Sequence, residues 1–361
     1  MRTLIAGGGT GGHLTPALAV AEALRDADPS GAVLMVSRRG GVGEELIREA
    51  GVALETLDIS GLDTSQPLTL LTAAARLPLA TLRALRLLRS FGADVVVGTA
   101  GYVCVPVVLA AGLLRVPVVL LEQNAHPGRA IRLLAPRARV VAASFAGTAA
   151  LLRKVRVVHT GNPLRAGLLA TPLEPLPEAP ARLLLTGGSQ GALRLNRALA
   201  GCVRRLLERH PTLRITHQCG TTGAADALAA AAALPETLRA RYEVAPFFLD
   251  LGARMRAADL VVMRAGGSSL AECSTIGRPM ILVPYAHAGG HQAYNAMPYV
   301  RGGAAVMVLD EECSAVRLRN EVGTLLADVE RWRGMARASA AMGHPEAAER
   351  VVGLIREVVR S

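Results

Sequence analysis

Lysine and aromatic residues are scarce in this sequence. Lys154 is the only lysine, so arginine carries almost all of the net charge of +11. An excess of this size favours an anionic partner, such as nucleic acid, an acidic membrane face or a diphosphate. Aromatic residues make up only 3% of the chain, which argues against nucleic acid because single-stranded binding platforms stack bases on aromatic rings. We therefore expect no nucleic-acid partner.

Paired cysteines and long apolar runs are missing as well. The five cysteines are scattered and never stand in C-x-x-C spacing, which argues against a disulfide framework and against a zinc site. The D-x-D pattern of Asp26 and Asp28 is predicted at a helix end away from the glycine-rich loops, so we predict no metal. No apolar run reaches the about 18 residues of a membrane span, and no signal peptide is recognisable at the start. We expect a cytoplasmic protein, either soluble or peripheral to a membrane.

Short apolar runs alternate with segments of helical period along the whole chain. This alternation is typical of a parallel sheet covered by helices on both faces. A second series of the same kind starts at "ARLLLTGGSQGALRLNRALA", at residue 181. We therefore predict an α/β protein with two Rossmann-like domains. The strands expected in the first domain lie near residues 2–6, 32–36, 94–98, 117–121 and 138–142.

A proline-rich segment separates the two series. "ATPLEPLPEAPA", residues 170–181, contains four prolines and no periodicity, which predicts an extended linker. We assign residues 1–163 to an N-terminal domain and residues 164–340 to a C-terminal domain. The last helix, 341–361, is amphipathic and is predicted to pack at the domain junction.

Glycine-rich turns follow the first strand of each series. "LIAGGGTGGH" and "LLLTGGSQGA" both lead from an apolar strand into a helix, where backbone N–H groups and the helix dipole favour a bound phosphate. A tight strand-to-helix turn without a ligand is the alternative for either loop. The first loop also matches G-x-G-x-x-G, but the next strand ends in a serine and two arginines rather than the acid that NAD requires. An NADP oxidoreductase therefore remains an alternative.

Four polar residues are candidates for binding or catalysis. His13 stands at the mouth of the first glycine turn and is a candidate general base, or a residue that orients a phosphate. Glu272 has two acceptor oxygens that suit the cis-diol of a ribose, although a glutamate that caps the helix fits its position equally well. Asn124, at the carboxyl end of a strand, and Gln292 are suited to sugar hydroxyls or an acetamido group.

A basic amphipathic segment covers residues 70–92. It places arginines among leucines at helical spacing, a pattern that can lie on an anionic membrane with its apolar side in the interface. A helix with a solvated arginine face is the alternative. The arginines are Arg76, Arg83, Arg86 and Arg89.

Seven motifs together resemble one enzyme family. "GGTGGH", "GTAGYVCVP", "LEQN", "GNPLR", "GGSQGA", "RAGGSSLAE" and "HQAYNA" occur in the order seen in the MurG family of bacterial N-acetylglucosamine transferases, and the resemblance spans residues 1 to about 305. It implies the GT-B fold, in which two Rossmann-like domains face across a cleft. It also implies inverting transfer of N-acetylglucosamine from UDP-N-acetylglucosamine to the 4-hydroxyl of the muramyl sugar of lipid I. The product would be lipid II, made without a cofactor at the cytoplasmic face of the cell membrane.

The resemblance also implies roles for individual residues. His13 would be the catalytic base, and Gly101 with Tyr102 would contact the acceptor. Phe248 would offer backbone groups to the uracil, and Arg165 with Ser189 would hold the diphosphate. A different GT-B transferase of UDP-sugars, or an epimerase, remains the alternative function. The other donor-binding residues that the resemblance implies are Thr10, Gly11, Gly12, Asn124, Gly267, Ser268, Ser269, Leu270, Ala271, Glu272 and Gln292.

Overall fold

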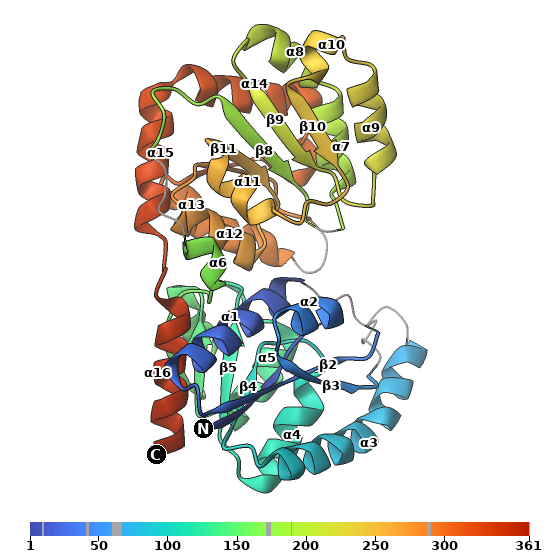
Figure 1. Ribbon diagram of the computed structural model, residues 1–361, viewed down its shortest axis with the longest axis vertical. Coiled ribbons are helices and arrows are strands. Elements are labelled where there is room, and N and C mark those ends of the chain that lie inside the picture. The colour runs from blue at the N-terminus through green and yellow to red at the C-terminus, as the bar shows by residue number, and fades with distance from the viewer. Residues whose placement is uncertain are drawn as a thin grey trace. The chain divides into compact units, whose positions relative to one another are not determined.

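The chain forms two compact units, each built on one sheet (Figure 1). The computed structural model describes residues 1–8, 11–40, 43–59, 67–170, 175–188, 190–286 and 290–360, without side chains at 11 and 67–75. The first unit is Met1–Leu169 together with His344–Ser361, and the second is Ala170–Gly343. The sequence predicted the first boundary after residue 163, six residues earlier, and the second after residue 340, three residues earlier. Residues 171–174 of the proline-rich linker lie outside the described residues.

The first unit has a seven-stranded parallel sheet in the order β3-β2-β1-β4-β5-β6-β7. Leu4 of β1 pairs with Leu34 of β2 on one side and with Val96 of β4 on the other. The strand order reverses between β1 and β4, which is where open α/β sheets bind ligands at the carboxyl ends of their strands. The strands are β1 Arg2–Ala6, β2 Ala32–Arg38, β3 Ala53–Leu57, β4 Val95–Gly98, β5 Val118–Glu122, β6 Val140–Ala143 and β7 Arg156–His159.

Helices cover both faces of this sheet because alternate residues of a strand point to opposite sides. Leu4 packs in the core beneath α3, α4 and α5, whereas Ile5 packs in the core beneath α1, α2 and α16. None of the described helices is long and apolar enough to cross a membrane. The helices are α1 Gly11–Ala27, α2 Gly43–Glu49, α3 Pro67–Phe91, α4 Cys104–Leu114, α5 Arg129–Leu134, α6 Ala166–Leu169 and α16 Ala347–Arg360, with short 3-10 turns at Ala135–Arg137 and Ala146–Leu151.

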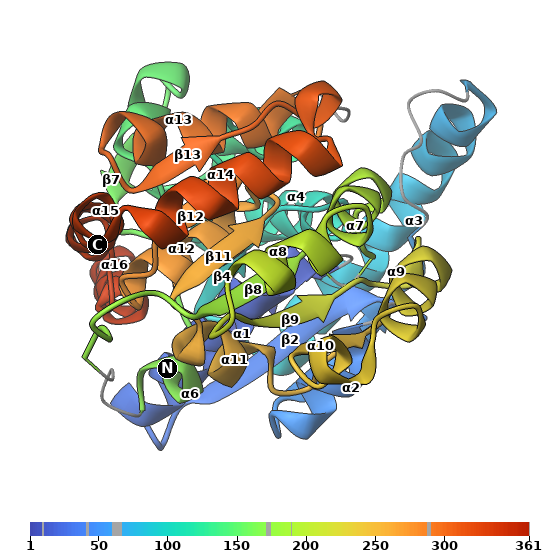
Figure 2. The same ribbon diagram turned by 90° about the horizontal axis from the view of Figure 1, so that it is seen from above.

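The second unit repeats the design with a six-stranded parallel sheet in the order β10-β9-β8-β11-β12-β13. Helix α14 packs beside α7 and α8 (Figure 2). The strands are β8 Arg182–Thr186, β9 Arg214–Gln218, β10 Tyr242–Ala245, β11 Leu260–Met263, β12 Met280–Leu282 and β13 Ala305–Met307. The helices are α7 Leu193–Ala200, α8 Val203–Arg209, α9 Ala224–Ala232, α10 Glu236–Arg239, α11 Leu251–Ala257, α12 Gly267–Thr275, α13 His291–Arg301, α14 Ala315–Ala327 and α15 Val329–Ala341, with a 3-10 turn at Asp310–Glu312.

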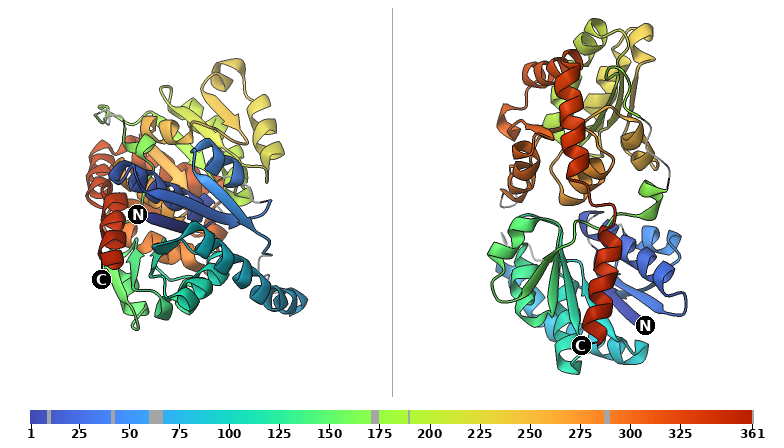
Figure 3. Two further views of the ribbon diagram at one scale, coloured as in Figure 1. Left: turned by 60° about the horizontal axis from the view of Figure 1, so that its bottom comes forward. Right: turned by 90° about the vertical axis from the view of Figure 1, so that its left-hand side faces the viewer.

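The last helix, α16, belongs to the core of the first unit (Figure 3). It packs against α1, β4, β5 and β6, and its Val351 and Ile355 are fully buried. This placement is more specific than the domain junction that the sequence predicted. The chain therefore leaves the first unit after Leu169, builds the second unit, and returns to the first at His344.

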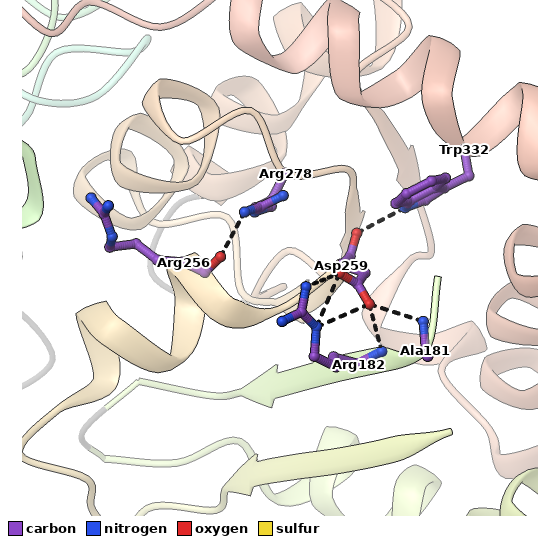
Figure 4. A network of polar contacts seen from close by, with 6 residues as sticks. All are labelled: Ala181, Arg182, Arg256, Asp259, Arg278 and Trp332. Carbon is purple, nitrogen blue, oxygen red and sulfur yellow. Dashed lines mark hydrogen bonds and ion pairs between the residues drawn. The ribbon is translucent and has the colours of Figure 1, made fainter. Parts of the chain in front are cut away.

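A buried carboxylate ties three elements of the second unit together (Figure 4). The side chain of Asp259, before β11, accepts hydrogen bonds from the backbone N–H of Ala181 at 2.9 Å and of Arg182 at 2.8 Å. The Arg182 guanidinium pairs with the same carboxylate at 2.7 Å. The indole N–H of Trp332, on α15, donates to the Asp259 carbonyl oxygen at 2.8 Å. One residue therefore joins β8, β11 and α15.

Replacing this carboxylate is expected to destabilise the second unit. Asp259→Ala leaves two backbone N–H groups and a guanidinium without their acceptor, which should lower the free energy of unfolding by about 3 kcal/mol. Trp332 is the only tryptophan in the chain, so its fluorescence during urea unfolding reports this unit directly. Asp226→Ala removes the exposed partner of Arg197 and is the control, with a loss below about 1 kcal/mol. Equal losses for the two variants would contradict the anchoring role of Asp259.

Candidate active site

The glycine loop after β8 leads into a helix whose N-terminus has no side-chain cap. Helix α7 begins at Leu193. The residue in the capping position is Ala192, whose methyl side chain cannot accept a hydrogen bond from the first turn. The N–H groups of Ala192 and Leu193 donate to no described residue. Other donors of the loop are used internally, because Gly188 donates to Thr186 Oγ1 and Gly191 donates to the Gly188 carbonyl. The free donors therefore gather at the first turn of α7.

Two glycines allow this loop to touch the segment that follows β9. Gly191 and Gly220 have φ angles of 82° and 67°, a region that favours glycine. A Cβ on Gly220 would lie 2.1 Å from the nitrogen of Gly191, and a Cβ on Gly191 would lie 2.3 Å from the carbonyl oxygen of Cys219. The N–H of Thr222 donates to the Gln190 carbonyl at 3.2 Å. The loop at 187–191 is thus braced by residues 219–222.

Helix α12, after β11, offers a second uncapped N-terminus. Gly266 caps it without a side-chain hydrogen bond, and the N–H groups of Gly267 and Ser269 donate to no described residue. Leu270 is fully buried and its N–H already donates to Gly266. Ala271 lies one residue further into the helix, where N–H groups bond to the preceding turn. Among the residues predicted here, Gly267 and Ser269 therefore offer free backbone donors.

The carboxylate of Glu272 lies in the second turn of α12 and does not cap the helix, since the first turn contains no acidic residue. No described residue bonds or pairs with this carboxylate. Burial raises the pKa of Glu272 to about 7, because a desolvated carboxylate without a partner favours its protonated form. The alternative of a capping glutamate is therefore wrong, and the residue stands ready for a ligand that donates hydrogen bonds.

Gln292 and Asn295, on α13, hold the turn between β11 and α12. The Gln292 side-chain oxygen accepts from the N–H groups of Ala265 at 3.2 Å and Tyr285 at 2.9 Å. This leaves the Gln292 NH2 group as the part able to bind a ligand. Asn295 is fully buried and donates to the Ala265 carbonyl, so its amide supports the backbone and does not face a sugar.

A cavity of about 920 Å³ brings several of these residues together within the second unit. Gly187, Gly191 and Leu193 line one part of it, and Tyr285 and Gln292 line another. Its size suits a small-molecule ligand. Glu272 and Phe248 do not line this cavity. The residues predicted to bind the donor substrate therefore do not all lie in one cavity.

Arg264 is a lining residue to which the sequence analysis assigned no role. Its guanidinium donates to the Val283 carbonyl at 2.9 Å and to Asp310 at 2.5 Å, and it lies 5.4 Å from the ring centre of Tyr285. The guanidinium is therefore held at the cavity wall as one half of an ion pair with Asp310, which lines the same cavity. Arg264 is the first residue of the motif "RAGGSSLAE", which could have indicated a role for it. The sequence analysis assigned roles only to later residues of that motif.

Phe248 has one backbone group already in use. Its N–H donates to the side-chain oxygen of Gln218 at 3.0 Å, and the guanidinium of Arg254 lies 3.9 Å from the centre of its ring. A uracil would therefore find the carbonyl oxygen of Phe248, whereas the N–H would first have to leave Gln218.

In the first unit, His13 lies in the first turn of α1 and faces the end of β5. Its Nδ1 is 3.1 Å from the side-chain oxygen of Gln123. The Gln123 NH2 group donates to the Leu121 carbonyl, which leaves that oxygen to accept from His13, so Nδ1 carries the proton. Burial lowers the pKa of His13. The ring is therefore neutral near pH 7, with the lone pair of Nε2 available to accept a proton.

Asn124 is held by the buried carboxylate of Glu122. One carboxylate oxygen accepts from the Asn124 backbone N–H at 2.8 Å and from its amide at 3.1 Å, and the other accepts from the Gly128 N–H at 2.8 Å. Burial raises the pKa of Glu122 despite these hydrogen bonds. The loop that presents Asn124 is thus fixed by its own neighbours.

Arg165 is paired within the first unit. Its guanidinium contacts the carboxylate of Glu22, on α1, at 2.8 and 2.9 Å. The other oxygen of Glu22 accepts the Ala166 N–H at 3.3 Å. A diphosphate, the ligand that the resemblance implies for Arg165, would therefore compete with Glu22 for the Nε and Nη2 donors of the guanidinium.

The remaining predicted residues lie in the loop before α4, in the first turns of α1 and α12, or outside the described residues. Gly101 has a φ angle of 83° and Tyr102 beside it is exposed, both in the loop between β4 and α4. Gly11 begins α1 and Gly12 follows it. Ser268 is buried in the first turn of α12. Thr10 and Ser189 lie outside the described residues.

Comparison with known proteins identifies the family. Residues 3–143 match the glycosyltransferase family 28 N-terminal domain, and residues 182–351 match the glycosyltransferase family 28 C-terminal domain. The UDP-N-acetylglucosamine--N-acetylmuramyl-(pentapeptide) pyrophosphoryl-undecaprenol N-acetylglucosamine transferase of Desulforudis audaxviator is 38% identical over 99% of this chain and 98% of its own. The transferase of the same name from Moorella thermoacetica is 38% identical over the whole of both chains. The chain belongs to the MurG family.

Solved structures agree with membership of the MurG family. The crystal structure of Acinetobacter baumannii MurG matches with a TM-score of 0.74 and 28% identity over 99% of both chains. A UDP-N-acetylglucosamine 2-epimerase of Neisseria meningitidis has a TM-score of 0.70 at 14% identity, covering 99% of this chain and 100% of its own, and shares the fold alone. The prediction of two Rossmann-like domains of the GT-B class is confirmed. The protein is a glycosyltransferase, which decides against the NADP oxidoreductase.

Proposed function

We propose that the protein transfers N-acetylglucosamine from UDP-N-acetylglucosamine to the 4-hydroxyl of the muramyl sugar of lipid I, producing lipid II. The names of its relatives support both substrates. The observation that carries the proposal is that α7 and α12, on the second unit, begin with N–H groups that donate to no described residue, and that α12 also presents the unpartnered carboxylate of Glu272. Free N–H donors suit the diphosphate of the donor, and the carboxylate suits its ribose.

The donor binds to the second unit in this proposal. The first turns of α7 and α12 donate to the phosphate oxygens, while Glu272 accepts both ribose hydroxyls. The NH2 group of Gln292 donates to the sugar, and the carbonyl oxygen of Phe248 accepts from the uracil. Arg264, paired with Asp310, lines the cavity wall.

The reaction is a displacement at the anomeric carbon. The acceptor oxygen forms a bond to that carbon as the bond to the diphosphate oxygen breaks, so the configuration inverts. Nε2 of His13 takes the hydroxyl proton, and Gln123 holds the ring in the tautomer that this requires. Negative charge grows on the departing UDP, where preorganised N–H donors lower its energy. The diphosphate competes with Glu22 for the guanidinium of Arg165.

UDP release from UDP-N-acetylglucosamine, measured with and without a lipid I analogue, tests the proposed function. We expect release that depends on the acceptor. Formation of an epimerised UDP-sugar without the acceptor would instead favour the epimerase, and release with another acceptor alone would favour a different GT-B transferase.

Donor binding should depend on the ionisation of Glu272. The ribose needs the carboxylate form, and the pKa of about 7 in the free protein means that this form is lost as the pH falls through 7. The dissociation constant of UDP should therefore rise about tenfold per pH unit well below pH 7. Calorimetric titration between pH 5.5 and 8.5 (roughly spanning this pKa) measures the dependence.

Glu272→Gln is the matched variant for this measurement. It removes the charge with little change in shape, so UDP affinity should be weak and should keep only the pH dependence of the terminal phosphate of UDP, which titrates near about pH 6. Glu236→Gln, at an exposed position on α10, should behave as the unmodified protein. A pH dependence as steep in Glu272→Gln as in the unmodified protein would exclude the ribose role.

The turnover number should depend on neutral His13. Because the pKa of His13 is lowered from its ordinary value of about 6.5, the charged ring forms only at more acidic pH. The turnover number kcat should therefore stay level at higher pH and fall only as the pH drops through the lowered pKa. His13→Ala should reduce kcat by about 100-fold or more and abolish this acid limb. Gln123→Ala should give a smaller loss, because the tautomer is no longer fixed. A kcat for His13→Ala within threefold (roughly) of normal would rule out the base role.

We also propose that α3 binds an anionic membrane face at the cytoplasmic side of the cell. Arg83, Arg86 and Arg89 are exposed on this helix, beside Leu79 and Leu82, each 54% exposed. Basic residues next to apolar ones are what a membrane interface binds.

Reversing two of these charges should release the protein from vesicles. Arg83→Glu combined with Arg86→Glu should weaken binding to vesicles rich in anionic lipid by tenfold or more, at about 1 kcal/mol per charge. Arg204→Glu combined with Arg205→Glu, on α8, changes the net charge equally and is the control. Cosedimentation measures both, and equal losses would show that α3 has no special role.

A further inference from the structure

A buried chain of three side chains lies behind the glycine loop of the second unit. His217, near the end of β9, has its Nδ1 2.7 Å from the hydroxyl of Tyr242, on β10, and its Nε2 3.0 Å from the side-chain oxygen of Asn196, on α7. His217 and Asn196 are fully buried and Tyr242 is 5% exposed. None of the steps proposed above uses these residues, which we call the His217 relay.

The direction of every hydrogen bond in the His217 relay follows from its last two acceptors. The Asn196 nitrogen lies 2.8 Å from the Cys219 carbonyl and 3.1 Å from the Thr222 carbonyl. Carbonyls only accept, so this atom is the NH2 group, and the Asn196 oxygen must accept from His217 Nε2–H. Nδ1 then holds the lone pair and accepts from the Tyr242 hydroxyl. Each polar atom of the neutral relay has a partner, and burial lowers the pKa of His217 to about 4.

The two carbonyls at the end of the relay belong to the segment that braces the glycine loop. Residues 219–222 touch Gly191 through backbone atoms, with no side chain between them, and Thr222 donates to Gln190. A shift of this segment therefore moves the loop directly. Gln218, next to His217, donates to Thr186 Oγ1 at 3.4 Å, and the same oxygen accepts the Gly188 N–H, so β9 supports the loop at two points.

We infer that Tyr242, His217 and Asn196 are positioning residues that set the shape of the diphosphate-binding loop. They act through the carbonyls of Cys219 and Thr222 and touch no substrate. The inference rests on the proposed function, because it takes the loop at 187–191 to bind the diphosphate. It predicts that breaking the relay weakens the hold on the diphosphate and spares the nucleoside.

The test compares UDP with uridine, which lacks the diphosphate. Asn196→Asp keeps the shape of the side chain but turns an oxygen toward two carbonyl oxygens, so the braced segment must move. UDP affinity should fall about tenfold or more, while uridine, measured as a competitor by ligand-observed NMR, should change less than about twofold. In steady-state assays KM for the donor should rise more than kcat falls.

Two further variants keep the test decisive. Tyr242→Phe removes a single hydroxyl and should give a smaller loss in the same direction if Asn196→Asp fails to fold, as Trp332 fluorescence would reveal. Ser339→Ala removes a different buried hydrogen bond of the second unit, to the Arg278 carbonyl, and should leave both affinities unchanged. Equal losses for UDP and uridine, or no loss in a folded variant, would overturn the inference. Failure of the unmodified protein to bind UDP would instead refute the proposed function.

Discussion

Unsatisfied N–H groups at the first turns of helices are the constraint on which the site depends. A helix that follows a parallel strand begins at the carboxyl edge of the sheet, and its first N–H groups have no partner within the helix. In α7 and α12 neither a serine, threonine, aspartate nor asparagine side chain fills that need at the capping position. Helices α14 and α15 differ, because Ser314 and Asp328 accept hydrogen bonds from the first turns of those helices. Ser314 lines the same cavity as Gly187 and Gly191, so open donors reach this cavity from α7 and not from α14.

Central strands could be predicted from the sequence, and of the four edge strands only β13 could, from its apolar run at residues 304–309. The three strands that the apolar runs did not reveal, β3, β7 and β10, all lie at the edges of their sheets. An edge strand is covered less completely, as the partly exposed residues of β3 and β7 show, so it lacks the continuous apolar run of a central parallel strand. A continuous apolar run indicates a strand that is buried on both faces of its sheet, and these three strands are not buried in that way.

The same distinction applies to the site. Glycine loops and Glu272 could be found because they are local features that follow a strand. The pairing of Arg165 with Glu22, the anchoring of Gln292 by two backbone N–H groups and the buried relay of His217 all join residues far apart in the sequence. Asn295 is fully buried and donates to the Ala265 carbonyl, a contact that its place in the sequence does not reveal. Partners of this kind depend on the completed topology.

The return of α16 to the first unit makes the second unit an insertion, joined by two covalent crossings at Leu169 and His344. During synthesis the second unit has all of its residues before the first unit receives its final helix. Until then Ile5, Val97 and Leu121 lack the apolar cover that Val351 and Ile355 provide. A chain that ends before α16 therefore leaves this face of the N-terminal sheet without its apolar cover, although every residue of the second unit is already present.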